Sequence, residues 1–203
     1  YYVNDAGRQI DILTASVYLR AIEIEDNIFP ESAYRGEYIK EIAKNANLQD
    51  AVNIDDLFKS LPEDDEEKID KIISHLKSAS EKDWQSIKKV SLESVLSTIE
   101  KDLEDFGVTF DNWFLESSLL GADSKIDAAV QQLNTNNLID NRDGNIWFKS
   151  SDFGDDKDRV LIRADGRQTY FASDVAYHKD KLDRGFDEII NIWGSDHHGY
   201  IKR

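Results

Sequence analysis

The chain has 203 residues with 40% hydrophobic content, enough to bury a core as one large domain or two small ones. Its formal net charge of −16 argues against strong nucleic-acid binding by this chain alone, because phosphate recognition depends on Lys and Arg. The sequence has no cysteine and no apolar run near the roughly 18 residues of a membrane-spanning helix, so disulfides, thiolate metal sites and such a span are excluded. We expect a cytoplasmic protein that does not contact a membrane.

The first part of the chain predicts a strand followed by two helices. The opening Tyr1-Tyr2-Val3 reads as the end of a strand, and the sequence contains no methionine, so we expect an internal segment of a longer protein. An apolar stripe at helical spacing predicts the first helix (Ile10, Leu13, Val17 and Ile24). Residues 27–35, with Pro30, predict a connector, and residues 38–46 predict a short helix.

The middle of the chain is strongly helical. Two sets of apolar residues follow the spacing of a buried helix face (Ile69, Ile72, Ile73 and Leu76; Leu92, Val95, Leu96, Ile99, Leu103 and Phe106). Pro62 predicts the first turn of the first long helix, and Gly107 predicts the end of the second. Ser124 and Asp127 resemble a capping box at the start of a helix over 126–133.

From Asn141 the pattern changes to short strands. The predicted elements are a turn (141–145), a strand (146–148), a hairpin around Asp165-Gly166 with arms 160–162 and 168–171, a helix (172–182) and a buried strand (189–193). The whole order predicts an α/β protein in which a long helical insertion interrupts the sheet. The acidic runs 63–67 and 100–105 are predicted to be a solvated helical face.

The candidate site lies near the end of the chain. Tyr170 and Asp174 are four residues apart, so on a helix they share a face. The polar run 194–199 follows the predicted strand 189–193, and ligands of open α/β sheets bind outside the carboxyl ends of strands. Both features together predict half of a small-molecule site.

Several segments of the sequence have both a structural and a functional interpretation. The segment from Asn4 to Gln9 is either an ordinary helix start, with Asn4 or Asp5 as N-cap, or a second wall of the same crevice. A metal at His197-His198 is disfavoured, because adjacent histidines point apart. Polar contacts to a ligand are favoured over a plain surface turn, because the histidines follow the end of a predicted strand. Trp113 and Phe114 are expected to pack under the insertion. The roles of Asp111 and Glu116 stay open, and Asp152-Phe153-Gly154 is read as a solvated loop because no other kinase motif accompanies it.

The sequence resembles one family along almost its whole length. Six segments occur in this order in bacterial arginyl-tRNA synthetases: 1–10 (YYVNDAGRQI), 36–40 (GEYIK), 110–119 (FDNWFLESSL), 156–163 (DKDRVLIR), 169–178 (TYFASDVAYH) and 193–200 (WGSDHHGY). Only about residues 47–105 lack a clear signature. Six ordered segments are far more specific than one short motif.

The resemblance implies a class I synthetase, with a partial Rossmann-like catalytic fold interrupted by a mostly helical connective insertion and a small β-hairpin region. It assigns 1–30 to a first Rossmann-like segment, 31–159 to the insertion and 160–203 to the returning segment. Such an enzyme activates arginine with ATP, accompanied by Mg²⁺, and transfers it to the 3′ end of tRNA(Arg). The resemblance implies a monomer in which tRNA contacts involve the full-length enzyme and the protein itself holds no metal.

The resemblance also assigns residues to the two substrates. Tyr170 and Asp174 would line the arginine pocket, where a carboxylate can pair bidentately with a guanidinium. His197 stands where some relatives have a Gln that touches arginine. The ATP side would be formed by Gly194, Asp196 and His198. The arginine-facing strand end would be formed by Asn4, Asp5 and Gln9.

Two signatures of class I enzymes are expected outside this sequence. The His-Ile-Gly-His type signature would precede Tyr1, and the Lys-Met-Ser-Lys type loop would follow Arg203. Both supply groups that stabilise charge on the phosphates, so we expect the isolated chain to be inactive and to contain no catalytic residue of its own. The alternative is a non-catalytic, acidic helical interaction module on a degenerate synthetase core.

Overall fold

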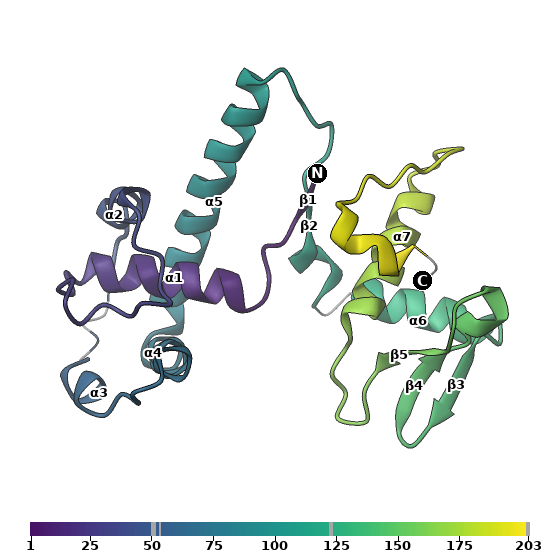
Figure 1. Cartoon of the computed structure of the whole chain (residues 1–203), viewed down its shortest axis with the longest axis horizontal. Helices are drawn as coiled ribbons and strands as arrows, with labels where there is room; N and C mark the ends of the chain where they lie inside the picture. Colours follow the sequence, from purple (N-terminus) through teal and green to yellow (C-terminus); the bar gives the residue numbers. More distant parts are fainter. Residues whose placement is uncertain (50–51, 53, 122–123, 202–203) are drawn as a thin grey trace. The chain divides into compact units, whose positions relative to one another are not determined.

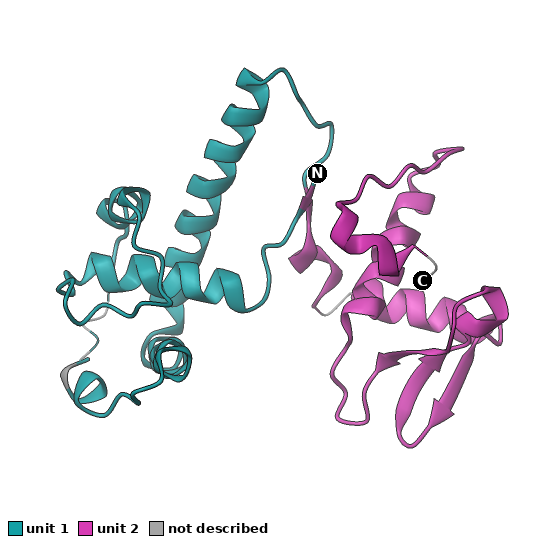
Figure 2. Cartoon of the chain, in the orientation of Figure 1, with its two compact units in different colours: residues 1, 3–113 teal, residues 2, 114–203 magenta. Residues whose placement is uncertain are grey.

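The computed structural model describes residues 1–49, 52, 54–121 and 124–201, and it divides into two compact units (Figures 1 and 2). Unit 1 contains Tyr1 and Val3–Trp113, and unit 2 contains Tyr2 and Phe114–Arg203. The boundaries predicted at 30/31 and 159/160 separate Rossmann-like segments from the insertion. The division into compact units does not test them, so they stay a prediction. No helix within the described ranges is long and apolar enough to cross a membrane.

Unit 1 is helical and is built around one central helix. Its elements are α1 (Arg8–Ala21), α2 (Glu37–Lys44), α3 (Asp55–Lys59), α4 (Asp65–Ala79) and α5 (Glu81–Asp105). Helix α1 packs against α2, α4 and α5, as Figure 1 shows. Every residue from Ile12 to Leu19 is buried. A helix surrounded by neighbours must be nearly apolar all round, so the stripe predicted from the sequence captures only part of its buried surface.

Two buried hydroxyl groups in α1 are satisfied within the helix. Thr14 Oγ1 donates to the carbonyl of Ile10 at 2.8 Å, and Ser16 Oγ donates to the carbonyl of Ile12 at 2.6 Å. Because a buried polar group without a partner is costly, these bonds make Thr14 and Ser16 tolerable in the core.

The helix predictions for the middle of the chain are confirmed, with one correction. Ile69, Ile72, Ile73 and Leu76 are all buried on α4, and together with residues of α1, α2 and α5 they form the core of unit 1. Helix α4 does not begin at Pro62, as predicted; it begins at Asp65. The physical reason is the carboxylate of Asp64, which caps the helix by accepting a hydrogen bond from the N–H of Glu67 at 2.9 Å.

Helix α5 ends at the predicted glycine. Gly107 has φ of 83°, a conformation that suits glycine, and the N–H of Val108 donates to the carbonyl of Leu103 at 2.8 Å. The apolar residues of its second half are less buried than their spacing predicts. Leu92, Val95, Leu96, Ile99 and Leu103 are half-buried, and Phe106 is 85% exposed.

Unit 2 combines helices with a small antiparallel sheet. Its elements are β2 (Phe114–Leu115), η1 (Glu116–Leu119), α6 (Lys125–Thr135), β3 (Ile139–Arg142), β4 (Asn145–Phe148), η2 (Ser150–Phe153), β5 (Arg159–Ile162), α7 (Tyr170–Asp183) and η3 (Ser195–Tyr200). The strand order is β3-β4-β5, with Ile139 opposite Phe148 and Trp147 opposite Val160. A separate two-stranded sheet joins β1 (Tyr2–Val3) and β2. The mixed α/β class predicted from the sequence is confirmed.

Helices α6 and α7 begin at hydroxyl caps. The predicted cap Ser124 is confirmed, since its Oγ accepts a hydrogen bond from the N–H of Asp127 at 3.2 Å. Thr169 caps α7 by accepting from the N–H of Ala172 at 3.3 Å, and its hydroxyl donates to the carbonyl of Val160 in β5 at 2.7 Å. One side chain therefore ties the start of α7 to the sheet.

Two strand predictions in unit 2 are wrong. The second hairpin arm, 168–171, is reduced to a single bridge between Ile162 and Gln168, because Thr169 caps a helix that starts at Tyr170. Residues 189–193 form no strand: Ile190 is 76% and Ile192 is 92% exposed. An apolar run becomes a strand only beside a partner strand, and no strand pairs with it in the part of the chain that the structure describes.

Candidate active site

Helix α7 presents Tyr170 and Asp174 on one exposed face. Tyr170 is 87% exposed, and Asp174 is also exposed. The opposite face is fixed by Ala172 and Ala176, which are each 1% exposed and pack in the core of unit 2. The buried alanines set the rotation of the helix, so the phenol and the carboxylate point to solvent together, as predicted from their spacing.

Lys181 continues this face and was missed by the sequence analysis. Its ammonium lies 4.2 Å from the centre of the Tyr177 ring and donates to Asn191 Oδ1 at 2.7 Å. Burial lowers the pKa of Lys181, and the nearby Arg184 lowers it further, whereas the charge of Asp174 raises it. The spacing of seven residues from Asp174 was the available signal, because two helical turns bring both side chains to the same face.

A pocket of about 670 Å³ lies in the last part of unit 2. It brings together three predicted site residues, Gly194, His197 and His198. The rest of its lining was not predicted to contact a ligand (Asn191, Trp193, Ser195 and Ile201). A pocket of this size, with two imidazoles, an amide and an indole, can hold a polar small molecule.

Asp196 lies beside this pocket rather than in its lining. Its Oδ2 is 3.5 Å from His197 Nε2, an ion pair when the histidine is protonated. A Cβ added to Gly194 would lie 2.5 Å from Asp196 Oδ1. A side chain at position 194 would therefore require the exposed carboxylate of Asp196 to move.

The remaining predicted residues belong to unit 1. Asn4 is exposed, whereas Asp5 is only 4% exposed, and its N–H donates to the carbonyl of Val3 at 3.1 Å. Helix α1 has Gly7 as its N-cap and no side-chain cap, so the interpretation of Asn4 or Asp5 as an ordinary N-cap is wrong. Gln9 Oε1 accepts a hydrogen bond from the hydroxyl of Tyr34 at 2.6 Å.

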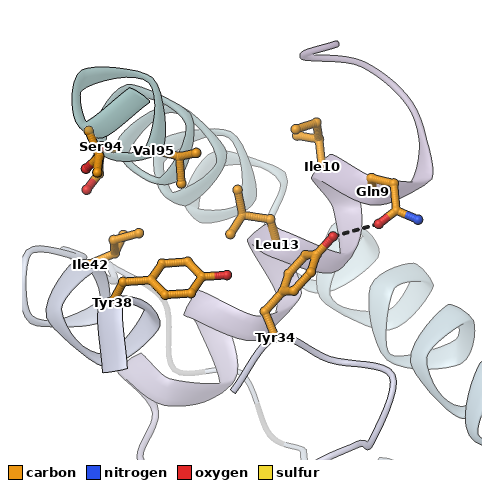
Figure 3. Close-up of a pocket in the computed structure, with 9 residues that line it drawn as sticks. Gln9, Ile10, Leu13, Tyr34, Tyr38, Ile42, Ser94 and Val95 are labelled. Atoms are coloured by element: carbon orange, nitrogen blue, oxygen red, sulfur yellow. Dashed lines mark hydrogen bonds between the residues drawn. The ribbon is translucent and has the colours of Figure 1, made fainter. Parts of the chain in front are cut away.

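Gln9 and Tyr34 also border a second pocket, of about 380 Å³, within unit 1 (Figure 3). Its walls come from α1, α2 and α5 and include Ile10, Leu13 and Val95. All its lining side chains are uncharged. This pocket suits an apolar or neutral group and offers no counter-charge to a phosphate or a guanidinium.

Comparison with known proteins gives one consistent result. The family described as "tRNA synthetases class I (R), catalytic domain" matches residues 2–203. The chain is 45% identical over 228 residues to a protein of Acinetobacter baylyi named arginine–tRNA ligase, with 100% of this chain and 38% of that protein covered. A protein of the same name from Psychrobacter cryohalolentis is 45% identical over 226 residues, with 100% and 37% covered.

A solved structure is similar over the same range. The crystal structure of an arginyl tRNA synthetase from Campylobacter jejuni has 37% sequence identity and a TM-score of 0.72, covering 100% of this chain and 40% of that chain. The chain thus spans 37% to 38% of the length of the two relatives described above.

Proposed function

The chain belongs to the catalytic-domain family of the class I (R) tRNA synthetases, and from this premise we propose that it forms part of an arginine–tRNA ligase. That enzyme would activate arginine with ATP and transfer it to the 3′ end of tRNA(Arg). The observation that carries this proposal is the exposed Tyr170–Asp174 face of α7, held in place by the buried alanines behind it. The alternative, a non-catalytic acidic module, is not favoured, because the family match spans 2–203 rather than the acidic helices alone.

Asp174 would recognise the side chain of arginine. A carboxylate accepts two parallel hydrogen bonds from a guanidinium, and this geometry selects arginine over lysine. Tyr170 would supply an aromatic face and a hydroxyl beside the same group. His197, Asn4, Asp5 and Gln9 are proposed to contact other parts of the amino acid.

Gly194, Asp196 and His198 would contact ATP. In the reaction a carboxylate oxygen of arginine attacks the α-phosphorus, forming an O–P bond while the bond from that phosphorus to pyrophosphate breaks. A ribose hydroxyl at the tRNA 3′ end then attacks the activated carbonyl and AMP leaves. This chemistry needs no protein nucleophile, so the role proposed for these residues is binding and orientation.

Mg²⁺ is proposed to enter with the phosphates of ATP. Within the described ranges no group of three or more His, Cys, Asp or Glu side chains could hold a metal ion. We therefore assign no step to a metal bound by this chain. A monomeric state and a cytoplasmic location stay predictions.

The test is Asp174→Asn in the full-length ligase that contains this chain. We expect the arginine KM to rise about tenfold to a hundredfold, because the change removes a charge-assisted hydrogen-bond pair, while the ATP KM stays within about twofold. Asp183→Asn is the matched control, since Asp183 is an exposed carboxylate of the same helix that pairs with Lys179 at 2.6 Å. Arginine-dependent ATP–pyrophosphate exchange measures both constants, and an unchanged arginine KM in Asp174→Asn would contradict the assignment.

A further inference from the structure

Tyr34 lies along helix α1 between two residues of one helix face. Its backbone N–H donates to Ser16 Oγ at 2.9 Å, and its hydroxyl donates to Gln9 Oε1 at 2.6 Å. Gln9 and Ser16 are seven residues apart, so two turns of helix, about 10 Å, separate them on the same side. One tyrosine therefore spans two turns of α1, fixed at both ends.

The buried hydroxyl of Ser16 links helix α1 to the backbone of Tyr34. Ser16 is 0% exposed, and its Oγ donates to the carbonyl of Ile12 while accepting from Tyr34. Both capacities of the hydroxyl are thus used. A core serine at this point anchors the backbone of Tyr34 to the middle of α1.

The loop that carries Tyr34 is held from two further sides. Asp65 at the start of α4 accepts hydrogen bonds from the N–H groups of Glu31, at 3.1 Å, and Ser32. Arg35 donates to the carbonyls of Phe29 and Pro30, the latter at 3.2 Å. The segment from Phe29 to Arg35 is thereby tied to α4 and to itself, so Tyr34 approaches Gln9 from a fixed direction.

The bond to Tyr34 decides which way the amide of Gln9 faces. Figure 3 shows the oxygen of Gln9 turned to Tyr34 and the nitrogen on the side away from it. An amide held by its oxygen keeps both N–H donors for another acceptor. The exposed side chain of Gln9 would otherwise sample many rotamers, and fixing it beforehand lowers the entropy cost of binding.

We propose that Tyr34 is a positioning residue for amino-acid recognition, which orients Gln9 so that its amide N–H groups meet an acceptor oxygen of the bound arginine. The proposal rests on the proposed function through the role of Gln9. It adds Tyr34 and Ser16, which no motif of the sequence analysis identified. Tyr34 does not touch the substrate; it acts through the direction that it gives to Gln9.

The first experiment uses this chain alone and requires no enzymatic activity. The side-chain amide signals of Gln9 are identified in a ¹H–¹⁵N spectrum by their loss in Gln9→Ala. We expect Tyr34→Phe, which removes only the hydroxyl, to shift these signals. Tyr38→Phe is the matched control and should leave them in place, because Tyr38 lines the same pocket and makes no hydrogen bond to Gln9 within the described residues.

The second experiment measures kinetics in the full-length ligase. We expect Tyr34→Phe to raise the arginine KM about fivefold, the effect of losing one neutral hydrogen bond, with kcat and the ATP KM within about twofold. Tyr38→Phe should change none of them. In a Gln9→Ala background, Tyr34→Phe should add nothing, because its effect passes through Gln9.

Each outcome decides the proposal. Unmoved Gln9 signals in Tyr34→Phe would show that the hydrogen bond does not orient the amide and would overturn it. Equal increases in the KM of arginine and ATP, or additive effects with Gln9→Ala, would indicate a purely structural role and would also overturn it. The spectrum requires no catalysis, so it tests the Tyr34 proposal even if the Asp174→Asn kinetics contradict the proposed function. The two failures are therefore distinguishable.

Discussion

Asp65 is the residue on which the loop before α2 depends. Its carboxylate accepts from the backbone N–H groups of Glu31 and Ser32 and pairs with Lys68 at 3.3 Å. Burial alone would raise the pKa of Asp65, but these hydrogen bonds outweigh it and lower the pKa to about 2. The ionised form is therefore more stable in the folded protein than in the unfolded chain, where the pKa is 3.8.

Replacing Asp65 should lower the free energy of unfolding and reduce the loss of stability at acid pH. A depressed folded pKa gives stability that is complete above the unfolded pKa of 3.8 and is lost as the pH falls from there through about 2. We expect Asp65→Asn to lower the free energy of unfolding by about 1–2 kcal/mol at pH 6, after allowing for partial solvent screening. Urea titrations at pH 6 and pH 2.5 measure this difference.

The exposed carboxylate of Asp56 serves as the control for that experiment. Asp56→Asn neutralises a carboxylate that is 88% exposed and pairs with Lys59 at 3.2 Å, so stability should stay within about 0.5 kcal/mol. If the Asp65→Asn variant lost as much stability between pH 6 and pH 2.5 as the unmodified chain, the role of this carboxylate would be rejected.

Among the elements, α5 carries acidic residues at both ends, so its charges suit the helix dipole at one end and oppose it at the other. Its first turn carries Glu81 and Asp83, which suit the positive end of the helix dipole. Its last turn has no basic residue and instead contains Glu104 and Asp105 at the negative end of the helix dipole. The acidic charges at the C-terminal end of α5 are therefore unfavourable. The packing of Trp84 and Ile87, each 1% exposed, stabilises the helix in spite of them.

Neutralising one acid at each end of α5 should have opposite effects. We expect Glu104→Gln to raise the free energy of unfolding by about 0.3–0.5 kcal/mol and Glu81→Gln to lower it by a similar amount, both at low ionic strength. Glu81 also accepts from Gln85 at 2.6 Å, which makes its loss slightly more costly. Thermal unfolding of both variants tests the pair, and equal signs would rule out the dipole as the cause.

Local sequence signals predicted the elements well, whereas non-local pairings escaped them. Gly107 and Ser124 end and start helices through bonds within a few residues, which a pattern can reveal. The strand predicted at 189–193 needed a partner strand that sequence periodicity cannot supply. The shared face of Tyr170 and Asp174 depends only on helical spacing and was predictable. The hydrogen bond from Tyr34 to Gln9 joins residues 25 positions apart, so no local pattern could predict it.

For the whole molecule, acid dominates the charge balance. Asp and Glu number 41 against 25 Lys and Arg. Most ion pairs among the described residues have at least one exposed partner, for example Arg8 with Glu66 at 2.6 Å, and such pairs add little stability. The net charge of −16 therefore acts mainly as self-repulsion in the compact state.

Salt should stabilise this chain. We expect the unfolding temperature to rise by about 2–5 °C between roughly 20 mM and 500 mM NaCl, because ions screen the repulsion more than they weaken the exposed pairs. Glu63→Gln combined with Glu100→Gln removes two exposed negative charges and should reduce this increase. A fall in the unfolding temperature with salt would mean that the ion pairs outweigh the repulsion.

The cap at Thr169 has a consequence for transplanting helix α7 into another protein. Its hydroxyl joins the carbonyl of Val160 to the first turn of α7, so the helix that presents Tyr170 and Asp174 takes its starting point from strand β5. A peptide or graft consisting of residues 169–178 would carry the side chains without the anchor that aims them. Engineers who seek to change the direction in which Tyr170 and Asp174 point should therefore vary β5 as well as α7.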